Sequence, residues 1–253
     1  MTSSMALPMA SFKESIATLD NCDLMNLMQQ RHSVRKFNDR PIEDDVRKAL
    51  EREIKTCNKE GDLSLQLILN NPEAFDSTLA HYGSFENVQN HIALIGPSRG
   101  DLEERCGYYG ERVVLLAQSL GLNTCWVALT YKKKNSAAQI APGEKFVLCI
   151  AIGYGKMQGV AHKIKTAEKV SRIPSEGEMP DWFKAGIDAA LLAPTAMNQQ
   201  RFRFDLQGTD NQGIALVRAN ALPTISCGKV DLGIAKLHFE LGANAVSNRW
   251  RFV

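Results

Sequence analysis

The chain alternates between segments with helical and strand-like spacing of apolar residues. Helical spacing marks residues 12–30 and 42–54, and a third helix is predicted from Asp101 to Gly121, since glycine suits the residue after a helix end. Strand-like apolar runs stand at 63–69, 91–96 and 145–153, of which the last two are typical of buried strands. This part of the chain therefore predicts helices and strands in mixed order.

A second set of elements follows residues 153–180, a stretch with little apolar periodicity that we predict to be a surface connector. The helix PDWFKAGIDAALLAP ends at Pro194, and the strands RFRFDL and GIALVRA precede a long helix, VDLGIAKLHFELGANAV. Because the order is mixed rather than a regular strand–helix–strand repeat, we predict an α+β fold. Its largely antiparallel central sheet would be flanked by helices.

Two of the predicted helical segments resemble each other. Residues 107–126 and 230–250 each run from a small residue through an apolar helix to Gly, then Asn or Thr, then Trp. A diverged internal duplication produces such a pair, and so do two unrelated amphipathic helices. The identity between the two segments is low, so both explanations stay open.

Composition and charge narrow the classes of function. Of the 253 residues, 44% are hydrophobic and 23% are charged, which allows a substantial buried core. The formal net charge of +2 is too balanced to indicate a polyanionic partner. The tight basic run Lys132–Lys134 has no interleaved aromatic residues of the kind that line a single-strand groove. We therefore expect no nucleic-acid partner.

The six cysteines and the short apolar runs indicate in which cellular compartment the protein is expected. The cysteines form no C-x-x-C pair, and no histidine cluster has metal-ligand spacing, so neither a disulfide framework nor a metal site is predicted. The apolar runs are far shorter than the ~20 residues of a membrane span. The N-terminal residues lack the pattern of a secretory leader. A cytoplasmic protein without a membrane partner is expected.

The segment RHSVR, residues 31–35, is the first candidate binding site. On an extended backbone Arg31, Ser33 and Arg35 point to one side. Two guanidinium groups and a hydroxyl on one side can clamp a phosphate, because arginine offers charge and paired donors together. A solvated basic loop has the same composition, and the spacing alone favours that simpler interpretation.

Three later segments are weaker candidates. Residues 193–200 place two carboxamides on a loop after a helix, where they could bind the edge of a uracil-like ring or satisfy local backbone groups. Residues 121–128 have small side chains that let a flat ring approach, although Trp126 fits a core position equally well. Residues 162–165 present two lysines on one side, which suits a phosphate or a plain surface pair.

Taken together, these segments resemble the nitroreductase family of FMN-dependent enzymes. RHSVRKFNDRPI is similar to the family's N-terminal signature, GLNTCWVAL followed by a strand and IGYG to a later signature, and APTAMNQQ to its Pro–Ser/Thr, Asn, Gln stretch. The likeness covers most of the chain from residue 24 onward. It implies a nitroreductase-like fold with bound FMN. It also implies ping-pong electron transfer from NADH or NADPH to a small acceptor such as a nitroaromatic or a quinone.

The resemblance also implies contacts to FMN. The arginines and serine of the signature would hold the phosphate and the polar ring edge, the lysines would add charge at the phosphate, and the carboxamides would bond the pyrimidine edge or ribityl chain. The implied cofactor-binding residues are Arg31, His32, Ser33, Arg35, Trp126, Val127, Ala128, Lys163, Lys165, Pro194, Thr195, Asn198 and Gln200. No catalytic side chain is implied, because the electron-transfer chemistry belongs to the cofactor.

Two departures from the family pattern matter. Ordinary members carry the Pro…Asn…Gln stretch soon after the N-terminal signature and bind FMN between two subunits, whereas here it stands at 193–200. A subfamily resembling a nitroreductase of thermophilic bacteria shares this order. That order implies two fused half-units, 11–160 and 161–253, in a monomer that imitates a dimer or in a homodimer. Arg201 and Phe202 replace the usual Pro-Trp. Two alternatives therefore stay open: a protein that binds flavin without turnover, and a protein without flavin.

Overall fold

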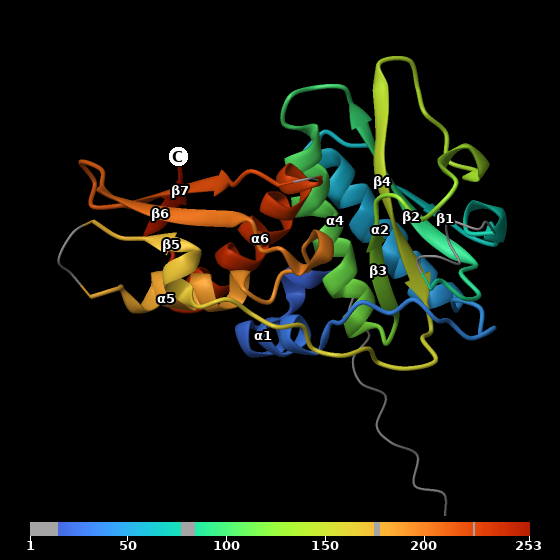
Figure 1. Cartoon of the computed structure of the whole chain (residues 1–253), viewed down its shortest axis with the longest axis horizontal. Coiled ribbons are helices and arrows are strands. Elements are labelled where there is room, and N and C mark those ends of the chain that lie inside the picture. Colours follow the sequence, from blue (N-terminus) through green and yellow to red (C-terminus); the bar gives the residue numbers. More distant parts are fainter. Residues whose placement is uncertain (1–14, 77–83, 175–177, 225) are drawn as a thin grey trace, which may run out of the picture.

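The structure is a computed structural model that describes residues 15–76, 84–174, 178–224 and 226–253 (Figure 1). The α-helices are α1 (Asn21–Gln30), α2 (Asp44–Gly61), α4 (Leu102–Ser119), α5 (Asp181–Ala190) and α6 (Gly228–Asn244). The strands are β1 (Gln66–Ile68), β2 (Asn90–Pro97), β3 (Asn123–Val127), β4 (Glu144–Gly153), β5 (Ser171–Arg172), β6 (Phe202–Thr209), β7 (Ala215–Ala221) and β8 (Trp250–Phe252). Within these described ranges, no helix has the length and apolarity needed to cross a bilayer.

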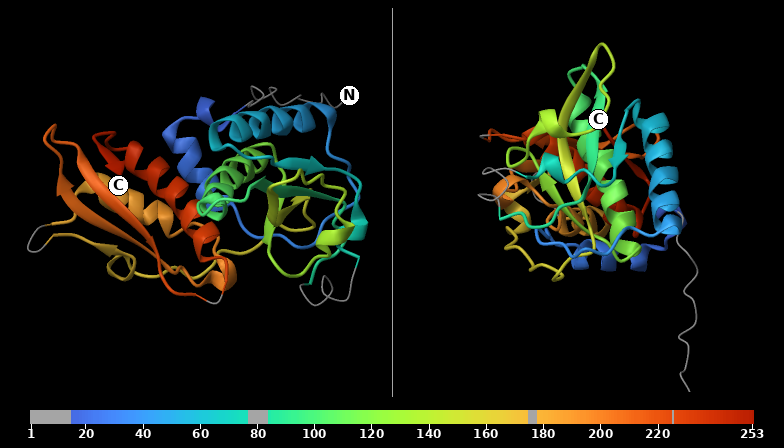
Figure 2. Two further views of the ribbon diagram at one scale, coloured as in Figure 1. Left: turned by 90° about the horizontal axis from the view of Figure 1, so that it is seen from above. Right: turned by 90° about the vertical axis from the view of Figure 1, so that its right-hand side faces the viewer.

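The strands form two separate sheets, so the prediction of one central sheet is wrong. The first sheet has the order β1-β2-β4-β3 and is antiparallel throughout. The second has the order β5-β6-β7-β8 and is antiparallel only between β6 and β7. Helices α4 and α6 lie between the sheets, which occupy opposite ends of the molecule (Figures 1 and 2). The strands are therefore kept apart by the helices on which each sheet packs, and the α+β class is confirmed.

Several element boundaries differ from those predicted. The helix expected over 12–30 begins only at Asn21, because Asp20 caps it by accepting a hydrogen bond from the Asp23 N–H at 2.7 Å. Residues 12–14 of that prediction lie outside the described part of the chain. The strand expected at 63–69 is only three residues long as β1. The short strands β5 and β8, which pair in parallel with β6 and β7, were not predicted.

Apolar residues cover both faces of the first sheet. One face packs on the main core between the helices, and the other packs on a second cluster around Phe37, Phe75 and Tyr131. Burial on both faces explains why β2 and β4 read as nearly continuous apolar runs rather than alternating ones. The prediction of buried strands at 91–96 and 145–153 is confirmed.

Helices α4 and α6 cross so closely that each needs a glycine at the contact. A Cβ atom on Gly107 would lie 2.1 Å from the carbonyl oxygen of Val230, and one on Gly233 would lie 1.9 Å from that of Glu104. The same sequence offset relates Glu104 to Val230 and Gly107 to Gly233, so the two helices meet in a symmetric way. Backbone contact at this distance leaves no room for any side chain.

We predict that Gly107→Ala or Gly233→Ala destabilises the fold by ~3 kcal/mol, because the methyl group must push two helices apart in a packed core. Urea unfolding followed by circular dichroism measures the loss. Gly100→Ala is the matched control, since its added Cβ would meet nothing within 4 Å. Equal stability of all three variants would contradict the close crossing.

Candidate active site

The segment that contains the arginine signature lies beside the edge strand of the first sheet. Helix α1 ends where the Arg31 N–H donates to the carbonyl oxygen of Leu27 at 2.8 Å, and the chain continues extended. Ser33 then bridges Thr124 in parallel, and the Val34 N–H donates to the Thr124 carbonyl oxygen at 2.9 Å. This pairing places the signature next to the start of β3.

The loop after α5 approaches the same place from the second half of the chain. Its residues Met197, Asn198 and Gln200 have φ values of 51°, 53° and 45°, in the left-handed region that non-glycine residues seldom adopt. The Gln200 N–H donates to the Thr195 hydroxyl at 3.0 Å, which closes the loop on itself. Such a backbone persists only where the surroundings hold it, and this is a common property of binding loops.

Two adjoining cavities separate the signature from this loop. Cavity A, of about 220 Å³, is bordered by the end of β3 and the first turns of α6. Cavity B, of about 350 Å³, is bordered by the start of the signature and by residues 160–162 of the connector. Both are lined by Ser33, Arg35, Pro194, Thr195 and Met197, so they form one continuous site.

A buried arginine with unused donors lies at the wall of cavity B. The Arg31 side chain is 2% exposed, and its Nε lies 3.7 Å from Oε1 of the fully buried Glu111. Its Nε and Nη1 have no hydrogen-bond partner among the described residues. Burial lowers the pKa of Arg31 and the Glu111 charge partly offsets this. Donors left unpaired in this way cost free energy, which an anionic ligand in cavity B would offset.

Glu111 also fixes two neighbouring side chains. Its Oε2 accepts a hydrogen bond from the indole N–H of Trp126 at 2.8 Å, and its Oε1 lies 3.0 Å from Nε2 of His238. The other ring nitrogen of His238 contacts the carbonyl oxygen of Ala189 at 3.1 Å. One carboxylate from α4 therefore links the arginine signature, β3 and α6.

Two histidines also belong to the wall of cavity B. His32 and His162 both line it, and Nε2 of His162 contacts the carbonyl oxygen of Leu191 at 3.1 Å. Burial is the main cause that lowers the pKa of each imidazole, and the charge of Arg31 lowers both further. None of the described residues that line this cavity carries a carboxylate. A bound dianion would favour the protonated imidazoles, so the cavity suits a phosphate.

Comparison with family models gives a match to the family described as "Putative TM nitroreductase", over residues 23–243. The chain belongs to this family. The match includes every residue of cavities A and B and every strand except β8, and it confirms the resemblance to nitroreductases seen in the sequence.

Solved nitroreductases share the fold. A putative nitroreductase from Thermotoga maritima superposes with a TM-score of 0.58 and 19% identity, covering 95% of this chain and 88% of that one. A putative nitroreductase from Desulfovibrio desulfuricans, solved in complex with FMN, gives a TM-score of 0.46 at 18% identity, covering 62% of this chain and 98% of that one. No curated protein matches the sequence.

Most of the predicted cofactor-binding residues line the two cavities. They are Arg31, His32, Ser33, Arg35, Trp126, Val127, Ala128, Pro194, Thr195 and Asn198. Trp126 is half-buried, so it serves both the core and the cavity wall. That these residues bind a cofactor stays a prediction.

The structure does not bring Lys163, Lys165 or Gln200 to either cavity. The Lys165 ammonium donates to the carbonyl oxygens of Gln199 and Gln200, at 2.6 and 3.0 Å. The carboxamide of Gln200 donates to the carbonyl oxygen of Lys163 at 3.0 Å, and the side chain is 1% exposed. These three residues hold the loop after α5 in place, because their polar groups bond one another across it.

The cavities also contain lining residues that were not predicted as site residues, and three of them bear most on the chemistry of the site. His162 precedes the two predicted lysines and lines cavity B in their place. Met197 lies in the motif APTAMNQQ and is 85% exposed at the border of both cavities. Asp231 is the least expected, because in the sequence it is an ordinary acidic residue in the first turn of a helix.

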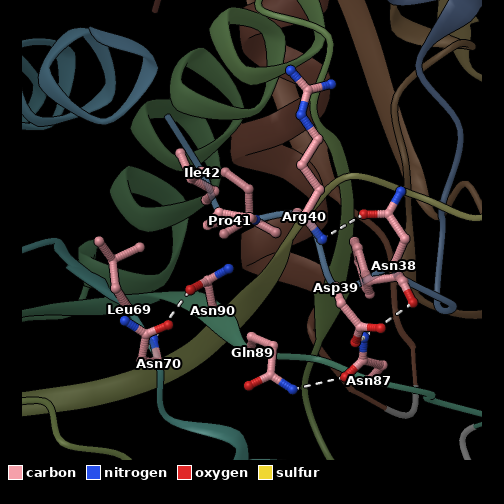
Figure 3. A pocket seen from close by; sticks show the side chains of 13 residues that line it. Asn38, Asp39, Arg40, Pro41, Ile42, Leu69, Asn70, Asn87, Gln89 and Asn90 are labelled. Carbon is pink, nitrogen blue, oxygen red and sulfur yellow. Dashed lines mark hydrogen bonds between the residues drawn. The ribbon is translucent and has the colours of Figure 1, made fainter. Parts of the chain in front are cut away.

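A third cavity, of about 360 Å³, opens elsewhere on the first sheet and shares no residue with cavities A and B (Figure 3). Its carboxamides already bond one another or the backbone. The Gln89 amide donates to Asn87 at 2.7 Å, the Asn87 amide to Asp39 at 2.7 Å, and the Asn70 N–H to Asn90 at 3.1 Å. We therefore assign the candidate site to cavities A and B.

Asp231 is a buried acid in the wall of cavity A. Its carboxyl is 3% exposed, and both oxygens accept the backbone N–H of Ala196, at 3.0 and 3.1 Å. Burial raises the pKa of Asp231 from 3.8 to about 7, and the hydrogen bond from Ala196 offsets only part of this. The acid therefore exchanges its proton near neutral pH.

We predict that Asp231→Asn raises the stability of the flavin-free protein above pH 7. The unfolded carboxyl ionises near pH 4 and the folded one near pH 7, so the wild type loses stability as pH rises through that window. A pKa difference of about three units between the folded and the unfolded carboxyl corresponds to about 4 kcal/mol of unfolding free energy. Urea unfolding at pH 4.5 and pH 8 should show a gain at pH 8 alone. The control Asp188→Asn, at an exposed i,i+4 pair with Lys184, should change little at either pH.

Proposed function

We propose that this nitroreductase-family chain is an FMN-dependent oxidoreductase that takes electrons from NADH or NADPH and passes them to a small acceptor such as a quinone or nitroaromatic. The observation that carries the proposal is the buried Arg31 with two unpaired donors at a cavity free of carboxylates. Family membership supports it as well.

The residues present fit FMN. Cavity B, with Arg31, His32 and His162, would hold the phosphate, because its ionisable side chains are cationic or become so. Cavity A, with the chain from Trp126 to Ala128, would hold the ring system between β3 and the loop after α5. Bound there, the flavin supplies the hydride chemistry, and the protein supplies orientation and electrostatics.

A ping-pong order suits the single continuous site. Neither the sequence nor the described fold contains the G-x-G-x-x-G turn of a Rossmann domain, so the nicotinamide has no separate dinucleotide site of that type. Donor and acceptor would therefore use cavity A in turn.

We further propose that the chain consists of two fused half-units, with a boundary near residue 160. The constant offset between the paired contacts at Gly107 and Gly233 supports this. Cavities A and B combine the signature and Trp126 from the first half with the loop after α5 and Asp231 from the second. One chain thus supplies both sides of the site, and a homodimer is not required for it.

The same offset relates Asp231 and Ile234 in cavity A to Arg105 and Tyr108 on α4. There, Arg105 donates to the carbonyl oxygen of Asp62 at 2.9 Å, and the Tyr108 hydroxyl donates to Glu240 at 2.8 Å. The Arg105 Nε has no hydrogen-bond partner among the described residues, but Glu104 and Glu240 lie next to this position and disfavour an anionic cofactor. We infer one FMN for each chain.

The alternative proposal is a protein that binds flavin but does not turn over. The replacement of the family's Pro-Trp by Arg201 and Phe202 is one reason to consider it. Phe202 is fully buried in β6, against Phe204, and Arg201 donates to the carbonyl oxygen of Pro223. Neither residue lines cavity A or B. The change therefore gives no reason to expect loss of turnover.

A reducing compartment such as the cytoplasm is consistent with the cysteines. All six are free thiols, and Cys57, Cys106, Cys125 and Cys149 are buried among apolar residues. Thiols of this kind behave as small apolar side chains. The cytoplasmic location stays a prediction.

The test of function is the visible absorption spectrum of the purified protein, loaded with FMN and freed of excess. We expect one flavin per chain and bleaching of its bands when NADH or NADPH is added without oxygen. A protein that retains no FMN would overturn the assignment. Bound flavin that neither nicotinamide reduces would favour the alternative without turnover.

The role of cavity B can be tested with Arg31→Ala, for which we predict ~10- to 100-fold weaker FMN binding, the usual loss of a charge-assisted hydrogen bond. Flavin fluorescence quenching measures it, and riboflavin, which lacks the phosphate, should lose less. The control Gln89→Ala lies in the third cavity and should bind FMN like the wild type. Equal losses for FMN and riboflavin would contradict the phosphate placement.

A further inference from the structure

Asp231 occupies an unusual position for a carboxyl group. It lies in the first turn of α6, lines cavity A and is 3% exposed. It has no ion-pair partner among the described residues, and both of its oxygens accept a hydrogen bond from the Ala196 N–H. A buried acid normally needs a cation or several donors, and this one has a single neutral donor.

The surroundings of this carboxyl are largely apolar. Trp126, Leu148, Val230 and Ile234 form the wall of cavity A around it. Desolvation of this kind disfavours the charged form, which is why the pKa of Asp231 lies at about 7. An acid in an apolar cavity, protonated near neutral pH, has the property that a general acid requires.

A purely structural role does not account for the carboxyl. An asparagine could accept the same Ala196 N–H through its amide oxygen and would avoid the loss of stability that ionisation of Asp231 causes above neutral pH. Packing therefore favours Asn over Asp at this position. What Asp has and Asn lacks is an exchangeable proton at a cavity wall.

The other ionisable groups of cavity A do not compete for this role. Arg35, from the signature segment, contributes a guanidinium group to the wall of the cavity and forms no ion pair with Asp231 among the described residues. Cys227, one turn before Asp231, has its pKa raised by burial, so the thiol stays protonated. The signature, the loop after α5, β3 and β4 contribute no other titratable side chain to this cavity.

We propose that Asp231 is a catalytic acid that protonates the electron acceptor while the acceptor is reduced in cavity A. The inference rests on the proposed function and deepens it. For a quinone, two electrons and one hydrogen arrive as hydride from the reduced flavin, and the carboxyl O–H breaks to give the second hydrogen as a proton. The products are a hydroquinone and the Asp231 carboxylate.

Water restores the proton afterwards. Cavity A is open at a border formed by Leu129 and Met197, which are 75% and 85% exposed. The acceptor class follows from this chemistry: compounds whose reduction consumes protons, such as quinones and nitroaromatics, profit from Asp231. An acceptor that takes up electrons alone does not.

The test compares two acceptors on FMN-loaded protein that has been reduced and then mixed rapidly with either benzoquinone or ferricyanide. For Asp231→Asn we expect flavin reoxidation by benzoquinone to slow by ~100-fold, the lower range for loss of a general acid. Reoxidation by ferricyanide, which accepts no proton, should stay within about twofold of wild type. The wild-type rate with benzoquinone should fall as pH rises through about 7, while the variant's rate stays flat.

A second readout does not depend on turnover. Infrared difference spectra of the wild type between acid and alkaline pH should show a protonated carboxyl band that Asp231→Asn lacks. Asp188→Asn, on the exposed side of α5, is the matched control and should behave as wild type in every measurement.

Two outcomes would overturn the inference and leave the proposed function standing. Equal slowing with both acceptors would mean that Asp231 acts on the flavin or the fold. An unchanged benzoquinone rate and pH profile in Asp231→Asn would mean that solvent supplies the proton. A wild type that binds no FMN, or whose flavin no nicotinamide reduces, would instead overturn the proposed function, and the inference with it.

Discussion

The backbone contact between α4 and α6 is the constraint on which the rest of the structure depends. At Gly107 and Gly233 each helix presses on a carbonyl oxygen of the other, so neither position admits a side chain. The crossing fixes the separation of the two sheets, each of which packs on one side of the helix pair. It also fixes the position of Glu111 relative to His238 and of α6 relative to β3.

The packing of α4 against α6 and β3 determines the electrostatics of the site. Glu111, on α4, partly neutralises the buried Arg31 and leaves two of its donors unpaired at cavity B. At the other end of the site Asp231 stands in a largely apolar wall and has no ion-pair partner among the described residues. One part of the site therefore attracts an anion, and the other holds a removable proton. This separation suits a cofactor with a phosphate at one end and redox chemistry at the other.

Membership of the nitroreductase family gives these features a common explanation. In the proposal, the signature segment comes from one half-unit and the loop after α5 from the other, joined by a connector along one side of the molecule (Figure 1). A single chain can then hold a cofactor that would otherwise need two subunits. At the related position on α4, Arg105 and Tyr108 have the acidic neighbours Glu104 and Glu240, so in the proposal this second position holds no cofactor.

The sequence by itself determined most helices, the buried strands and the signature around Arg31, because these depend on periodicity and local motifs. It also identified the loop at Thr195, whose proline and small residues form a local pattern. It did not predict that His162 rather than Lys163 faces the cavity, since the connector has no periodicity to orient its side chains. Only the tertiary structure decided the division into two sheets and the burial of Asp231. Both arise from helices packing on distant segments, and desolvation depends on those neighbours rather than on adjacent residues.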